Sequence, residues 1–351
     1  MKERTKEILR DGFGSLVNNA SAIRGAKNGP LWLTIVMFLL SLLLPVIPLF
    51  VAQAKVNGSS FMSTYSYGLE KTVTSVALDL KNNRNVEFLI GEDHLLSITE
   101  EGKAIDYNNY GSARPFASYV NEVSHQYDFL LFVSDAKTSA DKKAVNNTIT
   151  STKYVIGDVT QTANLENVYI PSYMVLYPDT LYVSIYKNNS ADVLTSSYNG
   201  DYKTMKVTTT GLSDFLTVTD KDGNVVAQDI TNNEYTDGVL VNFKKVMDRS
   251  YDKLKIRNMW GTSGIYLAIF FGLVVLMGFL MWLLTRGKNN PNNYFSIWLT
   301  MQVSARLAVS PAIITLIVGF FLTKYAPIIF ILTMGLRVMW ISMKELRPVQ
   351  A

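Results

Sequence analysis

Apolar residues along the chain gather in two stretches, residues 31–54 and residues 259–343, and the sequence between them is polar. The first stretch contains no charged side chain and is long enough to cross a hydrocarbon core of about 30 Å as a helix. Pro45 and Pro48 are expected to kink its outer half, which a packed membrane helix tolerates. The pattern therefore predicts a membrane anchor near the N-terminus and a membrane cluster near the C-terminus.

A cleaved signal peptide is the alternative for the first stretch, because residues 52–54 read Ala-Gln-Ala and resemble a cleavage site. The apolar core of a signal peptide is typically about 7–15 residues long, and this run is longer. A basic tail also precedes it. We therefore expect an uncleaved anchor.

The second apolar stretch divides into three further spans, at residues 259–285, 307–323 and 325–343. Pro311 is expected to bend the second of these. Residues 294–306 are also largely apolar, and two interpretations stay open for them: a helix at the membrane interface, or the first turns of one long bent helix. The chain is thus expected to cross the membrane four times.

Basic residues near the ends of the spans predict their orientation. They precede the first span, follow the second and follow the fourth; they are Lys2, Arg4, Lys6, Arg10, Arg24, Lys27, Arg286, Lys288, Arg306, Lys344 and Arg347. The short loop on the opposite side holds one cation, Lys324. Because Lys and Arg favour the cytoplasmic side, we predict that both termini are cytoplasmic and that residues 55–258 are extracellular.

The polar middle region has the pattern of a β-dominated domain, with short runs rich in Val, Tyr, Thr and Phe between clusters of Asn, Gly and Asp. Helices are expected at residues 116–123 and 238–256, and a hairpin turn at residues 220–224. Strands are expected at residues 85–90, 127–134, 168–177, 181–186 and 216–219.

These elements give the fold class α+β, in a membrane protein with about four transmembrane helices, one N-terminal and three C-terminal, and a β-dominated extracellular domain between the first two. The predicted parts are a cytoplasmic basic amphipathic tail at 1–29, transmembrane helix 1 at 30–54, the extracellular domain at 55–258, transmembrane helix 2 at 259–285, a cytoplasmic loop with an interfacial helix at 286–306, transmembrane helix 3 at 307–323, transmembrane helix 4 at 325–343, and a cytoplasmic tail at 344–351.

The cysteine content and the distribution of charge exclude several classes of protein and site. The chain has no cysteine, which excludes disulfides and thiolate metal sites and fits a bacterial cell membrane better than a eukaryotic surface. Residues 55–258 carry 20 basic and 25 acidic side chains, so the positive net charge of +4 comes from the segments beside the membrane. Binding to nucleic acid is therefore not expected, and the lipid bilayer is the expected partner of the basic excess.

Catalytic and metal-binding patterns are weak throughout. His94 and His125 stand apart from any motif and are expected in turns or at the surface. Asp220, Asp222 and Asn224 imitate the start of a calcium loop, but the glycine and the final glutamate of an EF-hand are missing, so a plain hairpin turn is expected. We expect no catalytic residue, no metal site and no cofactor, and we predict that the protein is not an enzyme.

Arg306 and Arg337 are the candidate functional residues of the C-terminal cluster, because a charge within a span is costly unless it finds a partner or reaches the headgroups. Arg337 lies about 10 Å along a helix from Lys344, so its side chain can reach the cytoplasmic headgroups. The alternative is that it packs inside the bundle or against a partner protein.

The N-terminal tail is predicted to form a short amphipathic helix. Lys2, Lys6 and Arg10 lie away from an apolar face that includes Phe13 and Leu16. Such a helix suits the inner leaflet of the membrane, and docking on a partner protein is the alternative.

The layout of the chain, the segment YMVLYPDTLYVSI at residues 173–185 and the segment NYFSIWLTMQVSARLAVSPAIITLIVGFF at residues 293–321 resemble a family of Gram-positive membrane proteins associated with maltodextrin utilisation, a domain of unknown function. The resemblance implies a link to the uptake of maltodextrin or related sugars, with subunits of an ABC importer as membrane partners. It supplies no catalytic motif, and so no site residue is carried over.

Three functions are compatible with these features. The favoured one is a non-enzymatic accessory or scaffolding subunit of a membrane complex. Co-purification in mild detergent followed by mass spectrometry tests it. The second is a sensor, whose extracellular domain passes a signal to a membrane partner, since the cytoplasmic parts are too short for a kinase or a DNA-binding domain. The third is an oligomeric transporter or channel subunit.

Overall fold

The computed structural model describes residues 2–63, 69–110, 114–121, 126–151, 155–156, 159–160, 172–187, 194–205, 216–286 and 290–346. The chain forms two compact units, one of residues 1–55 with 257–351 and one of residues 56–256. Four helical segments are long and apolar enough to cross a membrane, namely Leu31–Ala54, Asn233–Leu284, Ile297–Gly319 and Thr323–Lys344. The mixture of helices and sheets with four candidate spans confirms an α+β membrane protein.

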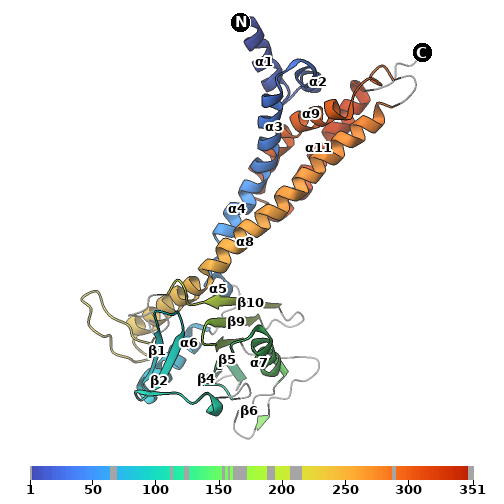
Figure 1. The fold of residues 1–351 in the computed structure, drawn as a ribbon. Helices are drawn as coiled ribbons and strands as arrows, with labels where there is room; N and C mark the ends of the chain where they lie inside the picture. Colours follow the sequence, from blue (N-terminus) through green and yellow to red (C-terminus); the bar gives the residue numbers. More distant parts are fainter. Residues whose placement is uncertain are drawn as a thin grey trace. The chain divides into compact units, whose positions relative to one another are not determined.

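A five-stranded sheet forms the centre of the unit of residues 56–256 (Figure 1). Its strands lie in the order β10-β9-β8-β5-β4, and β5 and β8 are parallel whereas the other neighbours are antiparallel. The strands are β4 (Ala117–Asn121), β5 (Gln126–Val133), β8 (Ser172–Leu176), β9 (Thr180–Lys187) and β10 (Leu194–Asp201).

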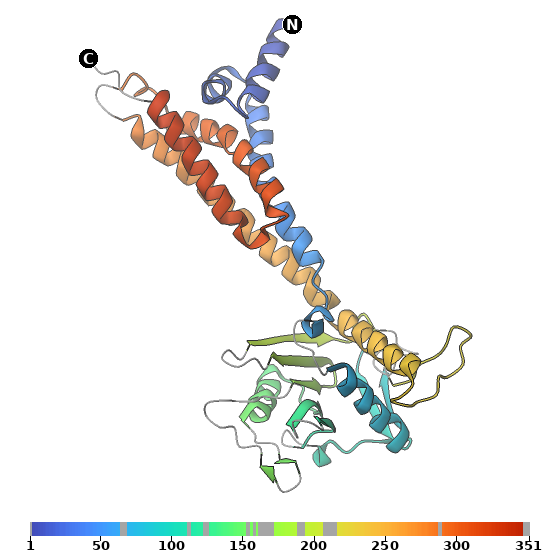
Figure 2. The same cartoon turned by 180° about the vertical axis from the view of Figure 1, so that it is seen from behind.

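Both faces of the interior strand β5 are buried, which explains its continuous apolar sequence. Phe129 and Leu131 belong to one core cluster, together with side chains of α6 (Leu69–Leu78) and of the first part of α8 (Asn233–Leu284). Leu130 and Phe132 belong to another, with Ile149 of α7 (Ser139–Ser151). Helices therefore cover both faces of the sheet (Figure 2).

A smaller antiparallel sheet packs into the first of these clusters. It consists of β1 (Val86–Ile90), β2 (Leu96–Glu100) and β3 (Lys103–Ala104), in that order. Side chains of β1 alternate between buried and exposed, as expected of a strand with one face on a core. Shorter elements of this unit are α5 (Ser60–Ser63), the π-helical turn η2 (Asp79–Asn83), the 3-10 turn η3 (Tyr107–Asn109), and the paired strands β6 (Val155–Ile156) and β7 (Val159–Thr160).

Four strand predictions overlap β1, β5, β8 and β9, and the helix expected at residues 238–256 lies within α8. The helix expected at residues 116–123 is wrong, because residues 117–121 form β4 and pair with β5. Pairing with a buried neighbour overrides the local helical pattern there. Residues 216–219 supply only an isolated bridge, from Thr219 to Val225, and α6 and α7 were not anticipated.

The other unit is helical throughout its described part. Its elements are α1 (Lys2–Gly14), α2 (Asn19–Asn28), α3 (Leu31–Leu43), the 3-10 turn η1 (Leu44–Val46), α4 (Ile47–Ala54), the later part of α8, α9 (Ile297–Leu307), α10 (Val309–Gly319), the 3-10 turn η5 (Thr323–Tyr325) and α11 (Ala326–Lys344).

Prolines interrupt two of the candidate spans. Pro45 lies in η1 and Pro48 in the first turn of α4, so a 3-10 turn interrupts the α-helix of the first span where the sequence places its prolines. The third span is divided at Ala308, between α9 and α10, and Pro311 follows in the first turn of α10. Residues 297–306 therefore belong to the same long interrupted span as residues 309–319, which favours the bent-helix interpretation over a separate interfacial helix.

An ion pair ties the small sheet to β4. Arg84 Nε lies 2.6 Å from Glu100 Oε1, and the Tyr110 hydroxyl donates to the other carboxylate oxygen at 3.0 Å. The Arg84 guanidinium also donates to the carbonyl of Phe116 and lies 4.2 Å from the centre of its ring. The hydrogen bond from Arg84 lowers the pKa of Glu100, because it stabilises the ionised carboxylate.

We expect Glu100→Gln to reduce the sensitivity of this protein to acid. A carboxylate whose pKa is lower in the folded state contributes stability above its unfolded pKa, and that stability is lost as the pH falls through the folded pKa. At neutral pH the substitution should cost roughly 1 kcal/mol of unfolding free energy. Thermal unfolding of the full-length protein in detergent between neutral pH and about pH 3 measures both effects.

The matched control is Glu87→Gln, at an exposed position of β1. It should leave the fall in melting temperature on acidification unchanged, whereas Glu100→Gln should make that fall smaller. Equal acid sensitivity in the wild type and in Glu100→Gln would contradict the role assigned to this ion pair.

Candidate functional site

The segment after β5 and the start of α7 form a partly polar concave region in the unit of residues 56–256. In sheets with parallel strands joined by a helix, ligands commonly bind outside the carboxyl ends of the strands. Ser134 N donates to the carbonyl of Leu176 at 3.0 Å, which brings the segments after β5 and β8 together. A pocket of about 560 Å³ lies beside them, lined by Ser134, Asp135, Ala136, Lys137, Asp141, Ala144 and Val145.

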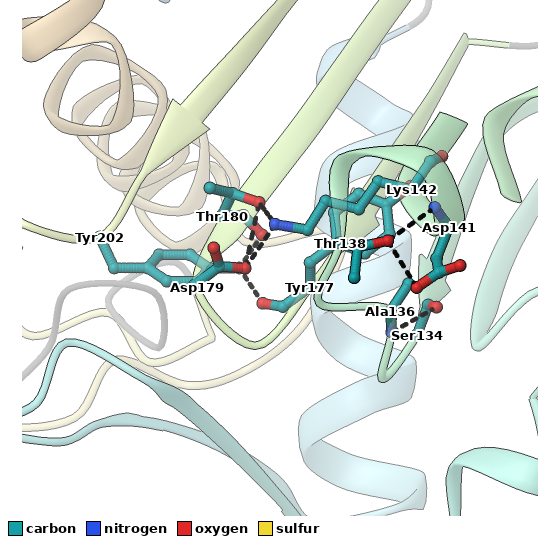
Figure 3. Close-up of polar contacts among 9 residues, drawn as sticks. All are labelled: Ser134, Ala136, Thr138, Asp141, Lys142, Tyr177, Asp179, Thr180 and Tyr202. Atoms are coloured by element: carbon teal, nitrogen blue, oxygen red, sulfur yellow. Dashed lines mark hydrogen bonds and ion pairs between the residues drawn. The ribbon is translucent and has the colours of Figure 1, made fainter. Parts of the chain in front are cut away.

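The start of α7 is fixed by the side chain of Thr138. Its hydroxyl accepts a hydrogen bond from Asp141 N at 3.2 Å and donates to Asp141 Oδ2 at 2.7 Å (Figure 3). A threonine followed three positions later by an acidic residue is a frequent sequence at a helix N-terminus, because the two side chains satisfy its unpaired groups. One wall of the pocket is therefore held in a defined position.

Lys142 joins α7 to the turn between β8 and β9. Its ammonium group pairs with Asp179 and donates to the Thr180 hydroxyl at 2.8 Å, and it lies 5.4 Å from the centre of the Tyr177 ring. Figure 3 shows these side chains converging on the β8–β9 turn. The charge of Lys142 is thus already compensated by groups of the chain itself.

Two buried tyrosines complete this cluster. The Tyr202 hydroxyl lies 3.0 Å from the Tyr177 carbonyl and 2.9 Å from the Thr180 carbonyl. The Tyr177 hydroxyl lies 3.2 Å from the Lys142 carbonyl. Burial raises the pKa of both tyrosines, so both remain protonated donors at physiological pH. The arrangement links α7, the β8–β9 turn and the segment after β10.

The turns singled out in the sequence have local roles. His94 lies in the turn between β1 and β2, with a positive φ of 60°, whereas His125 lies outside the described residues. The Asp220 carboxylate accepts hydrogen bonds from Asn224 N at 2.8 Å and from Asp222 N at 2.9 Å, and Gly223 has a φ of 84°. The hairpin turn predicted at residues 220–224 is therefore confirmed. Within the described ranges, no group of three His, Cys, Asp or Glu side chains is placed to bind a metal.

Arg306 lies fully buried in the helical unit, near the end of α9. Its Nε and Nη2 atoms lie 3.1 Å and 2.8 Å from the hydroxyl oxygen of Thr34 in α3. Gly25 and Gly29 flank the guanidinium, and a Cβ atom at Gly25 would lie 2.6 Å from Arg306 Nη1. The side chain thus joins α2, α3 and α9.

Arg337 of α11 is the second basic residue inside this unit, and it hydrogen-bonds to three neutral acceptors. They are the Asn19 side chain at 3.2 Å, the Leu307 carbonyl at 2.8 Å and the Ser15 carbonyl. The Leu307 carbonyl is the one that residue 311 would bond in a continuous helix, and Pro311 has no N–H to donate. Arg337 therefore satisfies a backbone group that the proline leaves without its helical partner.

The remaining candidate residues lie on α1, which confirms that the N-terminal tail contains a helix. Lys6 and Arg10 are exposed, and the side chain of Lys2 lies outside the described residues. Arg10 lies 4.0 Å from Asp11. The apolar face is partly open, since Phe13 is 71 % exposed. Contact of this helix with lipid stays a prediction.

The sequence reasoning found the two arginines but not the groups that surround them. Thr34 lies far from Arg306 in the chain, and an apolar span gives no reason to single out one threonine. One signal was present: Gly25 and Gly29 lie one helical turn apart on the same face, a spacing typical of close contact with a neighbouring helix. The Gly25–Gly29 spacing predicts that another helix lies close to this face, although it does not identify Arg306 as the side chain in contact.

Comparisons of the chain with protein-family models, with curated proteins and with solved structures gave no match. The resemblance to the maltodextrin-utilisation family therefore stays a prediction.

We expect Gly25→Ala to destabilise the helical unit, because the new methyl group would press on the buried Arg306 guanidinium. Overpacking of this kind typically costs about 1–3 kcal/mol, and here it also disturbs the hydrogen bonds to Thr34. Thermal unfolding of the full-length protein in mild detergent, followed by loss of monodisperse protein on gel filtration, measures the effect.

Gly335→Ala is the matched control, because Gly335 also lies in a helix of this unit and a Cβ atom there would meet nothing within 4 Å. It should keep or slightly raise the melting temperature, as alanine is the better helix former. If the two variants unfold at the same temperature, the tight packing around Arg306 does not contribute to stability.

Proposed function

We propose that this protein is a non-enzymatic accessory or scaffolding subunit of a bacterial membrane complex, associated with a carbohydrate importer of the maltodextrin type. In this proposal both termini are cytoplasmic, the unit of residues 56–256 is extracellular, and that unit contacts the partner. The expected partners are membrane subunits of an ABC importer together with the lipid bilayer.

The observation that carries the proposal is the use of Arg306 and Arg337 inside the helical unit. Both guanidinium groups bond to hydroxyl, amide and carbonyl groups of the same chain. They join helices to one another. A bundle fixed in this way suits an anchor that holds another domain at the membrane surface.

A transporter or channel subunit has less support. The four predicted spans contain no Asp or Glu, so a carboxylate relay or a sodium site has no residue to use. Within the described part of the helical unit, the buried polar side chains besides the arginines are mostly Ser and Thr. Such side chains favour packing of helices over conduction of ions.

Direct stacking of a sugar on Tyr173 or Tyr177 is also disfavoured. Tyr173 and Tyr177 are 2 % and 1 % exposed, so their rings belong to the core and offer no platform to a ligand. The link to carbohydrate import has its support in the resemblance of residues 173–185 and 293–321. An accessory role fits both points, because it needs a partner surface and no sugar platform.

A sensor is the second candidate, favoured by the pocket between the segment after β5 and the start of α7. One wall is set by the capped start of α7, and the pocket offers Asp135, Lys137 and Asp141 to a polar ligand. A ligand bound there would stabilise the folded domain, and the stabilisation would grow with the logarithm of ligand concentration above Kd.

The proposed orientation predicts that Ser97→Cys reacts with a membrane-impermeant maleimide in intact, wall-stripped cells. The chain has no cysteine, so the reagent finds a single thiol, and Ser97 is exposed on β2. Labelling should reach the level seen after the cells are opened. Gel shift of the purified protein gives the extent of reaction.

Asn293→Cys is the opposite probe, in the exposed segment before α9. It should react only after the membrane is opened. Labelling of Asn293→Cys in intact cells, or protection of Ser97→Cys until lysis, would overturn the proposed orientation.

The proposed function predicts that the full-length protein, extracted in mild detergent, retains ABC-importer subunits in a constant ratio. Mass spectrometry of the purified material identifies and quantifies them. A tagged membrane protein with a similar number of spans, expressed at the same level, controls for carry-over. Repeated recovery of this chain alone would contradict the accessory role.

The same preparation separates the sensor from the scaffold. Addition of a panel of maltodextrins should leave the melting temperature unchanged for a scaffold. A rise that depends on sugar concentration and is lost in Lys137→Ala, at the edge of the pocket, would favour the sensor instead.

A further inference from the structure

A long groove runs along α11 in the helical unit, with a volume of about 1050 Å³. Its walls come from α10, from α11 and from the link between α1 and α2. The residues that line it along α11 extend from Thr333 to Lys344, a distance of about 16 Å in a helix. The groove is therefore long enough for a headgroup and part of an acyl chain.

Two basic side chains and several polar ones line the groove. The basic ones are Arg337 and Lys344, and the polar ones include Asn18, Asn19 and Glu345. The acceptors of Arg337 are all neutral, so no ion pair in the described part of the chain compensates its charge. Its guanidinium carries N–H groups beyond the three that are bonded, and these suit an anionic oxygen.

The rest of the groove is apolar and open. Leu336, Met339 and Trp340 are 61 %, 54 % and 60 % exposed, and Ile314 of α10 lies on the opposite wall. These helices belong to two of the candidate membrane spans, so the open apolar surface is of the kind that hydrocarbon covers. The groove therefore offers both positive charge and open apolar surface, which match the headgroup and the acyl chain of one lipid molecule.

We infer that this groove binds an anionic phospholipid, with its phosphate beside Arg337 and Lys344 and one acyl chain along α10 and α11. Basic pockets between transmembrane helices are known to hold acidic lipid headgroups, and charge complementarity favours an anionic lipid over a zwitterionic one. A bound lipid would cover the open apolar wall and compensate the charge of Arg337. This site goes beyond anchoring, since it selects one class of lipid.

Native mass spectrometry of the full-length protein in mild detergent tests the inference. Phosphatidylglycerol and phosphatidylcholine with identical acyl chains are added in equal amounts, and bound lipid is counted per chain. We expect one phosphatidylglycerol to be retained preferentially. Lys344→Gln should weaken its retention about fivefold, the effect of one basic residue near an anionic headgroup. Equal retention of the two lipids by the wild type would overturn the site.

Lys324→Gln is the matched control, because Lys324 is an exposed cation near the other end of α11 and does not line the groove. It should leave lipid retention unchanged, and an effect equal to that of Lys344→Gln would contradict the inference.

A second variant tests the apolar part of the groove. Ser310→Phe, on the α10 wall, keeps all charges and should displace the lipid by filling the groove. Unchanged phosphatidylglycerol retention in this variant would place the lipid elsewhere. Inorganic phosphate at millimolar concentration should not displace phosphatidylglycerol, and displacement would show a free-anion site instead.

Discussion

The helical unit depends on how the chain itself solvates two guanidinium groups. A charged side chain inside a membrane span is costly unless hydrogen-bond acceptors replace the water it has lost. The Arg306 guanidinium donates hydrogen bonds to the hydroxyl oxygen of Thr34. The Arg337 guanidinium donates to one side-chain amide oxygen and two backbone carbonyls. The Leu307 carbonyl is available because Pro311 has no N–H to donate to it. Arg337 supplies the missing donor, and the carbonyl supplies an acceptor for the guanidinium.

These acceptors come from segments far apart in the chain, and this determines which parts form one unit. Ser15 and Asn19 come from the start of the sequence, and Gly25 leaves the space that the Arg306 guanidinium occupies. The N-terminal region therefore belongs to the helical unit through α2, whereas only α1 presents an open amphipathic face. An anchor built in this way includes residues that the sequence pattern assigns to a cytoplasmic tail.

The sequence predicted what depends on local composition. The four spans follow from apolar length, the prolines mark the interruptions, and β1, β5, β8 and β9 follow from runs of β-branched and aromatic residues. Residues 117–121 were predicted as helix because their pairing with β5 is not a local property. The acceptors around the arginines escaped prediction for the same reason: Thr34 is separated from Arg306 by most of the chain, and only the Gly25–Gly29 spacing pointed to a close contact.

Arg337 joins helices of the helical unit and also lines the groove along α11. If α11 moved away from the end of α9, the Leu307 carbonyl would lose its donor and the guanidinium would lose an acceptor, both in an apolar environment where each loss is costly. This penalty disfavours the relative motion of helices that a transport cycle requires. The same side chain lines the groove along α11, so the residue that holds the bundle together also presents positive charge to whatever occupies it. In the proposed scaffolding role, such a bundle would serve as the anchor, and the lipid inferred for the groove would hold it in the membrane.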